Sequence, residues 1–163
     1  MPKPNGLDRT DARVLLALAR APRATTIALA QQLGLSRNTV HARLVALDQR
    51  GALDSFERRI APAAIGYPLT AFVTTRVVQR QLDAVATALS EIPEILQVQG
   101  ISGETDLLVQ VVAADADDLY RIAGQILAVP GVERTNTALV MRQLLPYRIT
   151  PLLERQLNQP DGR

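Results

Sequence analysis

The stretch Leu29-Ala-Gln-Gln-Leu-Gly-Leu-Ser-Arg-Asn-Thr-Val-His-Ala-Arg-Leu44 places a glycine and a serine between two runs of helix-forming residues. Gly34 can adopt the left-handed backbone conformation that ends a helix, and Ser36 can accept a backbone hydrogen bond at the start of the next one. Ala30 is small enough to let the two helices approach closely. The stretch therefore predicts the spacing of a DNA-binding helix-turn-helix. Two packed helices with an ordinary solvated face are the alternative.

The second of these helices, expected from Ser36 to about Arg50, has two different faces. On a helical wheel of roughly 100° per residue, the apolar side chains Val40, Leu44 and Leu47 gather on one side. Small or polar side chains lie on the other side, at Asn38, His41, Ala42 and Val45. An exposed face of this kind suits the major groove, where Arg, Asn and His can donate hydrogen bonds to base edges and phosphates.

We therefore expect Arg37, Asn38 and His41 to contact base edges, although His41 has the alternative of a structural surface histidine. Contacts to phosphates are expected from a second group of hydroxyl and basic side chains, namely Ser36, Thr39, Arg43, Arg58 and Arg59.

Segments on either side complete the expected DNA-binding domain. Asp8 is a good helix cap, and Asp11 follows three residues later, so the first helix is expected from Asp8 to about Arg20. The next helix begins near Thr25 or Thr26 and ends at Gly34. Gly51 stops the third helix. Residues 52–60 are expected to form a short hairpin wing that carries Arg58 and Arg59, with a solvated hairpin edge as the alternative.

Composition restricts the class of protein. The chain has 163 residues, enough for one domain or two small ones, and it contains no cysteine, which excludes disulfides and thiolate metal sites. Its first residues lack the apolar core of a signal peptide, and no stretch is apolar enough to span a bilayer. These features predict a cytoplasmic protein that does not enter a membrane.

Charge is distributed unevenly along the chain. Residues 1–62 contain ten basic and five acidic side chains, a net charge of +5, whereas the remainder contains eight basic and eleven acidic ones, a net charge of −3. A basic module joined to an acidic one is the expected electrostatic pattern of a nucleic-acid reader with a separate second domain. Chance partitioning is the alternative.

The pattern changes after a linker. Two prolines and a glycine interrupt residues 61–68, and residues 69–144 then alternate between strand and helix signals. Strands are expected at 69–78, 95–101, 106–113 and 132–144, and helices at 81–92 and 115–129, the second with Leu119, Ile122, Ile126 and Leu127 directed inward. The order βαββαβ predicts a ferredoxin-like α+β domain in which two helices cover one face of a four-stranded antiparallel sheet.

The other face of that sheet also needs burial, which favours a homodimer. The predicted domains are residues 1–61 for the winged helix-turn-helix, 62–68 for the linker and 69–147 for the ferredoxin-like domain. Residues 148–163 form a tail in which Thr150–Gln159 is expected to be a short helix.

Motifs in both domains resemble one known family. In order they are Leu7-Asp8-x-x-Asp11, Leu29-Ala30, Gly34-Leu35-Ser36, Val40-x-x-Arg43-Leu44, Leu47-x-x-x-Gly51, Gly66-Tyr67, Gly103-Glu-Thr-Asp106 and Val129-Pro-Gly-Val132 with Thr135-x-Thr137. The ordered set is similar to that of the leucine-responsive/AsnC (Lrp/AsnC) family of transcriptional regulators. The resemblance implies a winged helix-turn-helix that binds double-stranded DNA and a ferredoxin-like effector domain. It also implies dimers that assemble further, often to octamers, and a response to small ligands, usually amino acids.

The same resemblance implies an effector site between the second domains of neighbouring subunits. It would include the loop residues Ser102, Gly103, Glu104, Thr105 and Asp106, with Thr135, Asn136 and Thr137 contributing from the last strand. In this loop Gly103 frees backbone N–H groups for a carboxylate, and Asp106 can meet an ammonium group; a β-turn with a structural acid is the alternative. Leu107 stands where family members often carry an aromatic residue, so the identity of the effector is left open.

Two other functions are alternatives. Siroheme decarboxylases resemble the same architecture but use a histidine in the second domain, whereas the only histidine here is His41. We therefore expect no enzyme activity, no catalytic residues, no metal site and no cofactor. A ligand-binding scaffold that does not bind DNA is the second alternative, against which the basic first domain and its intact turn argue.

Overall fold

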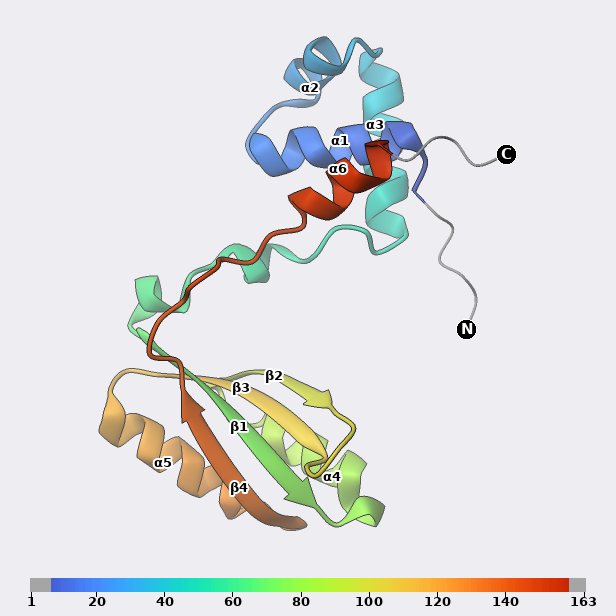
Figure 1. The fold of residues 1–163 in the computed structure, drawn as a ribbon. Helices are drawn as coiled ribbons and strands as arrows, with labels where there is room; N and C mark the ends of the chain where they lie inside the picture. The colour runs from blue at the N-terminus through green and yellow to red at the C-terminus, as the bar shows by residue number, and fades with distance from the viewer. Residues whose placement is uncertain (1–6, 159–163) are drawn as a thin grey trace. The chain divides into compact units, whose positions relative to one another are not determined.

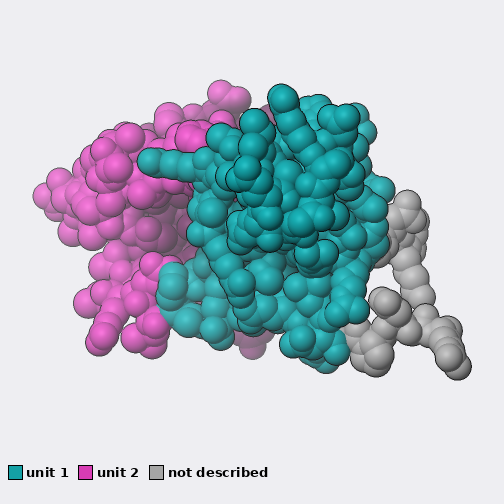
Figure 2. All heavy atoms as spheres, turned by 90° about the horizontal axis from the view of Figure 1, so that it is seen from above, with its two compact units in different colours: residues 1–55, 145–163 teal, residues 56–144 magenta. Residues whose placement is uncertain are grey.

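A computed structural model describes residues 7–158, and in it the chain forms two compact units. The first unit, called the head here, joins the residues up to Ser55 with those from Leu145 onward, and the second contains Phe56–Leu144. Figure 2 colours the two units separately. The head therefore includes the tail, which the sequence had suggested as a separate segment from residue 148, and the other unit begins before the expected boundary at residue 61.

Three helices at the start of the head follow the predicted pattern. They are α1 (Arg9–Arg20), α2 (Thr26–Leu33) and α3 (Arg37–Gln49). Asp8 and Asp11 form a reciprocal capping box at α1, and Ser36 caps α3 by accepting the Thr39 N–H. Gly34 ends α2 with a φ of 67°, the left-handed conformation that a side chain would disfavour. These caps and the turn between α2 and α3 confirm the helix-turn-helix.

The head core lies where the helix periodicity predicted it. Val40 and Leu47 of α3 are fully buried, Val40 packs with Leu29, and Leu44 is half-buried against the same cluster. The opposite side of α3, with Asn38 and His41, is exposed. Burial of one apolar stripe thus decides which face of α3 is available for contacts.

The expected hairpin wing at residues 52–60 is wrong. The segment has no strand, and Phe56–Arg59 forms a 3₁₀ turn (η1) closed by the Ile60 N–H on the Glu57 carbonyl at 3.0 Å. Tight hairpins favour residues with positive φ at their turn. Positive φ values in the described chain occur only at glycines, and none lies between Gly51 and Gly66. A second 3₁₀ turn, η2 (Pro62–Ile65), follows in the expected linker.

The second unit confirms the ferredoxin-like arrangement (Figure 1). All neighbouring strands are antiparallel, in the order β2-β3-β1-β4. The elements are β1 (Leu69–Val77), η3 (Gln79–Gln81), α4 (Leu82–Ser90), β2 (Ile95–Gly100), β3 (Leu107–Ala113), α5 (Ala116–Leu127) and β4 (Val132–Leu139). The last strand is shorter than predicted because its partner β1 begins at Leu69. The Val140 N–H still donates to the Thr70 carbonyl, but no residue of β1 precedes Leu69 with which the remainder of the predicted strand could pair.

One face of the sheet is packed and the other is open. Alternate residues of β1 and β3 are buried with apolar residues of α4 and α5, including Val73, Val109, Val85 and Ile122. Leu127 was expected in this core but is half-exposed, because it lies one residue beyond the buried stripe that ends at Ile126. The opposite face has no helix of this unit over it.

The tail forms α6 (Thr150–Asn158), as predicted, and α6 packs on α1 (Figure 1). Leu153 is only 6% exposed. The Arg20 guanidinium pairs with Glu154 at 3.0 Å, and the Gln156 amide donates to the Leu7 carbonyl at 2.7 Å. The final residue of the predicted helix, Gln159, lies outside the described residues. The packing makes α6 a fourth helix of the head.

Replacing Leu153 with alanine is expected to lower the free energy of unfolding of the head by about 2 kcal/mol, because a buried leucine is lost. Leu152 is 60% exposed on the same helix, so Leu152→Ala is the matched control and should change stability by less than about 0.5 kcal/mol. Urea unfolding followed by circular dichroism measures both. Equal effects of the two substitutions would contradict the docking of α6 through Leu153.

Candidate functional site

The first turn of α3 presents the residues that the sequence singled out for base contacts. Arg37, Asn38 and His41 are all exposed. The cap that precedes them is well defined: Ser36 Oγ accepts the Thr39 N–H at 3.0 Å and lies 2.8 Å from Thr39 Oγ1. The helix start is thus held rigidly by its own side chains, while three donors remain directed to the exposed side of the helix.

Arg43 has a different environment from the one expected of a phosphate contact. Its guanidinium pairs with the Asp8 carboxylate and, at 2.9 Å, with Asp11 Oδ1. Asp11 is 2% exposed, and Arg50 approaches its other oxygen at 3.6 Å. These pairs join the start of α1 to the middle and end of α3. Arg43 therefore acts within the head as a residue that holds α3 in place.

The same cluster shifts two pKa values. Burial raises the pKa of Asp8, but hydrogen bonds from the Asp11 N–H and the Arg43 side chain outweigh it, so the pKa of Asp8 lies below its ordinary value. The pKa of Arg43 is raised by its hydrogen bonds to Asp8 and then Asp11. A carboxyl whose pKa is lowered in the folded state adds stability above its unfolded pKa and loses that contribution as the pH falls through the folded value.

Arg43→Gln is expected to destabilise the head by about 1 to 3 kcal/mol at pH 7, because the buried Asp11 loses a charged partner. The difference from wild type should shrink as the pH falls below about 4 and through the lowered pKa of Asp8, because protonated Asp8 loses its charge attraction to Arg43. Arg37→Gln on the same helix is the control and should leave stability unchanged. Thermal unfolding between pH 3 and pH 7 tests this, and an Arg43→Gln variant as stable as wild type would contradict the structural role.

Arg58 and Arg59 lie in η1, which belongs to the second unit, and not in a wing of the head. The Arg59 guanidinium lies 5.5 Å from the centre of the Phe56 ring, a cation–π contact between two exposed side chains. The assignment of both arginines as phosphate contacts stays a prediction.

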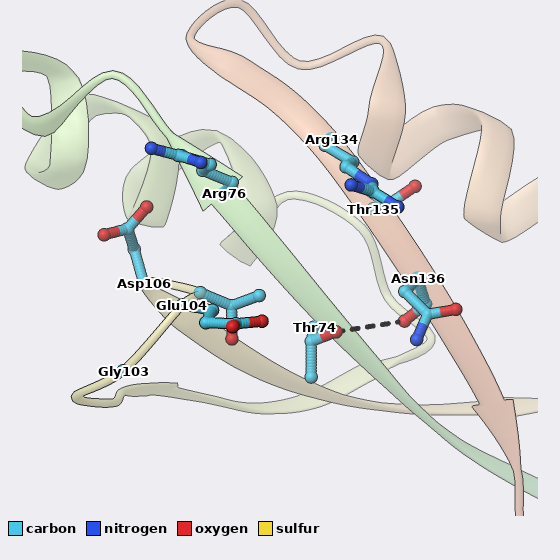
Figure 3. Close-up of a pocket in the computed structure, with 9 residues that line it drawn as sticks. Thr74, Arg76, Gly103, Glu104, Asp106, Arg134, Thr135 and Asn136 are labelled. Atoms are coloured by element: carbon cyan, nitrogen blue, oxygen red, sulfur yellow. Dashed lines mark hydrogen bonds between the residues drawn. The ribbon is translucent and has the colours of Figure 1, made fainter.

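A second candidate site lies in the sheet domain, where a pocket of about 810 Å³ opens between β1, β4 and the loop from β2 to β3 (Figure 3). Nine residues line it: Thr74, Arg76, Gly103, Glu104, Thr105, Asp106, Arg134, Thr135 and Asn136. Six of them are among the expected effector residues, whereas Ser102 and Thr137 are not in the lining.

Three lining residues were missed in the sequence, namely Thr74, Arg76 and Arg134. The signal for the first two was the alternation along β1, where Val73, Thr75 and Val77 are buried and the residues between them face the open side. The strand register then brings Arg134 directly opposite Arg76. No pattern in a single strand indicates that pairing.

Asp106 has a structural role as well as a place in the pocket. Its Oδ2 accepts the Val77 N–H at 2.9 Å, its N–H donates to the Thr75 carbonyl, and its carbonyl accepts from Ile101. The loop is thereby tied to the end of β1 beside the bulge that follows Arg76. The Oδ1 atom has no hydrogen-bond partner among the described residues.

Within residues 7–158, no group of three or more His, Asp or Glu side chains could hold a metal ion. No helix in this part of the chain is long and apolar enough to cross a membrane.

Comparison with known proteins identifies the family of both domains. A model of the winged helix-turn-helix DNA-binding family matches residues 7–52, and the Lrp/AsnC ligand-binding domain matches residues 70–149. The transcriptional regulator AldR of Mycolicibacterium smegmatis is 30% identical over 142 residues, which are 85% of this chain and 83% of AldR. The chain belongs to the Lrp/AsnC family.

Other Lrp/AsnC relatives point in the same direction. The transcriptional regulator FL11 of Pyrococcus horikoshii is 29% identical over 83% of this chain and 90% of its own. A solved structure of the feast or famine regulatory protein of M. tuberculosis, in complex with L-methionine, has a TM-score of 0.78 and 30% identity. The alignment covers 88% of this chain and 97% of that one. The chain is thus a transcriptional regulator with a DNA-binding helix-turn-helix and a ligand-binding domain. Residues 150–158, which form α6, lie beyond both family matches.

Proposed function

We propose that the chain binds specific DNA sites through α3 and changes this binding when an amino acid occupies the sheet pocket. The exposed first turn of α3, held by its cap and by the Arg43 cluster, is the observation that carries the DNA-binding part. The polar pocket of the Lrp/AsnC domain supports the ligand-binding part, as does the L-methionine bound to the M. tuberculosis relative.

On DNA, a homodimer places two copies of α3 in successive major grooves, with half-sites about one helical turn, or roughly 34 Å, apart. Arg37, Asn38 and His41 contact base edges. Phosphate contacts come from Ser36 and Thr39, with further contributions from Arg58 and Arg59 of η1. Arg43 is left out of this set because its guanidinium is already engaged by two carboxylates.

The open face of the sheet supports a homodimer. Phe72 and Leu108 lie half-buried on that face, with no helix of their unit over them. A second copy that covers this face removes apolar surface from water, which supports a dimer. Assembly of dimers to an octamer is the further expectation that the family resemblance adds.

The loop from Ser102 to Asp106 binds the α-carboxylate and the α-ammonium of the ligand. Backbone N–H groups around Gly103, whose φ is 126°, can meet the α-carboxylate, and Asp106 Oδ1 can meet the α-ammonium. Ligand binding would bias the arrangement of subunits and so the spacing of the two heads. Couplings of this kind are typically about 1–3 kcal/mol.

Alanine at Arg37 or Asn38 is expected to lower operator affinity about tenfold and to relax sequence preference, since each contact to a base edge contributes about 1–3 kcal/mol of discrimination. Gln49→Ala, at the far end of α3, is the control and should bind as wild type does. Gel-shift titrations against the upstream region of the chain's own gene and against unrelated DNA measure both quantities.

If Arg37→Ala and Asn38→Ala bind with unchanged affinity and preference, the assigned reading face is wrong. If the wild-type protein shifts no DNA even at low salt, where phosphate contacts are strongest, the proposed function as a DNA-binding regulator is wrong. A ligand-binding scaffold that does not bind DNA is then the better-supported function.

Asp106→Asn is expected to weaken amino-acid binding about tenfold while it spares DNA binding without ligand, because the amide keeps an acceptor for Val77 but loses the charge that meets the ammonium. Asp83→Asn on α4 is the control. A thermal-shift screen of the twenty amino acids, followed by titration, measures the effect. Loss of both folding and DNA binding in Asp106→Asn would show that this carboxylate is structural only.

A regulator rather than an enzyme is the function that the relatives support, since they are named transcriptional regulators. We expect the purified protein to show no haem-type absorption band, in contrast to a siroheme decarboxylase-like enzyme. Because its partner is DNA, we expect the protein to act in the cytoplasm.

A further inference from the structure

We infer that the ligand of the sheet pocket is a dicarboxylic amino acid whose side-chain carboxylate is held between Arg76 and Arg134. This inference rests on the proposed function, in which the pocket binds an amino acid, and it adds the chemical class of that ligand. Three features of the pocket carry it.

The first feature is the pairing of two arginines. Arg76 of β1 and Arg134 of β4 stand directly opposite each other in the strand register, and both line the pocket. Like charges directly opposite each other in a sheet are destabilising. An anionic group bound between the two guanidinium groups would relieve this repulsion, and the planar guanidinium suits a carboxylate because it can donate two parallel hydrogen bonds.

Little else in the chain neutralises this pair. Glu133 Oε2 lies 3.7 Å from Arg76 Nε, but both side chains are more than half exposed and Glu133 is not in the lining. Exposed pairs of this kind contribute little. Arg134 forms no ion pair within residues 7–158. The pair therefore offers two guanidinium groups to a ligand.

The second feature is that the basic and the acidic residues of the lining come from different elements. The arginines come from β1 and β4, whereas Glu104 and Asp106 come from the loop between β2 and β3 (Figure 3). An amino acid whose ammonium and α-carboxylate lie at the loop would direct its side chain toward the two strands. The loop acids also disfavour a DNA phosphate backbone at the same place, because they would repel it.

The third feature is the absence of apolar side chains. The nine lining residues are threonines, arginines, acids, one glycine and one asparagine. A methionine or leucine side chain would find only the methyl groups of threonines and the methylene groups of arginines and acids in this chain's lining, and burial of apolar surface is what makes such ligands bind. An anionic side chain has two basic partners, Arg76 and Arg134, in the lining of the same pocket.

Isothermal titration calorimetry on the full chain tests the inference with L-aspartate, L-glutamate, their amides L-asparagine and L-glutamine, and L-methionine. The variants are Arg134→Gln and Arg76→Gln, with Arg80→Gln as the matched control, because Arg80 is an exposed arginine of the same unit outside the pocket lining. Circular dichroism checks that each variant is folded, and gel shifts without ligand check its DNA binding.

We expect an acidic amino acid to bind at least tenfold more tightly than its own amide and than L-methionine. Arg134→Gln and Arg76→Gln should each remove most of the preference for acid over amide and leave the amide's own affinity within about twofold. Arg80→Gln should keep the wild-type preference.

Two failures are distinguishable. If no amino acid binds the wild-type protein, the proposed ligand-binding function fails and this inference fails with it. If amides or L-methionine bind as tightly as the acids, or if the acid-to-amide ratio is unchanged in Arg134→Gln, only the inference is overturned. A third result would also overturn the inference. If folded Arg134→Gln binds DNA more weakly without ligand, and its ratio of affinities for acidic amino acid and amide is unchanged, Arg134 is a phosphate contact.

Discussion

The register of β1 is the constraint on which the second unit depends. β1 pairs with β3 on one side and β4 on the other, so a shift by one residue would exchange its buried and open faces. The buried set, which includes Val73 and Val77, holds the strand against the helices. The open set then carries Arg76 to a position opposite Arg134 and beside the loop that Asp106 ties to β1. The core thus positions the pocket.

The head depends on a cluster of ion pairs between α1 and α3. Asp11 is buried with its charge, which is costly unless the charge is paired, and Arg43 and Arg50 supply the partners from α3. The pairs set how α3 lies on α1 and so which of its side chains are exposed. On the other side α6 packs against α1. The chain therefore enters the head twice, and β4, which carries pocket residues, continues toward α6.

Sequence patterns predicted most elements because their signals are local. Asp8, Ser36 and Gly34 marked helix ends through their own hydrogen bonds or φ, and both domains were placed in the correct order. The hairpin wing failed because residues 52–60 contain no residue with positive φ that could form a tight turn between two strands. The inward placement of Leu127 failed because the buried stripe of α5 ends one residue earlier. The ion pairs of Arg43 could not be predicted because its partners lie 32 and 35 residues away.

The amino-acid sequence was sufficient for the helix-turn-helix, the order of strands and helices, and the loop at Gly103, since each depends on neighbours within a few residues. Tertiary structure alone decided three further matters. It paired Arg76 with Arg134, placed α6 on α1, and joined Arg43 to Asp8 and Asp11 in ion pairs. All three join segments far apart in the chain, and the energy of such contacts depends on packing and register that no local pattern encodes.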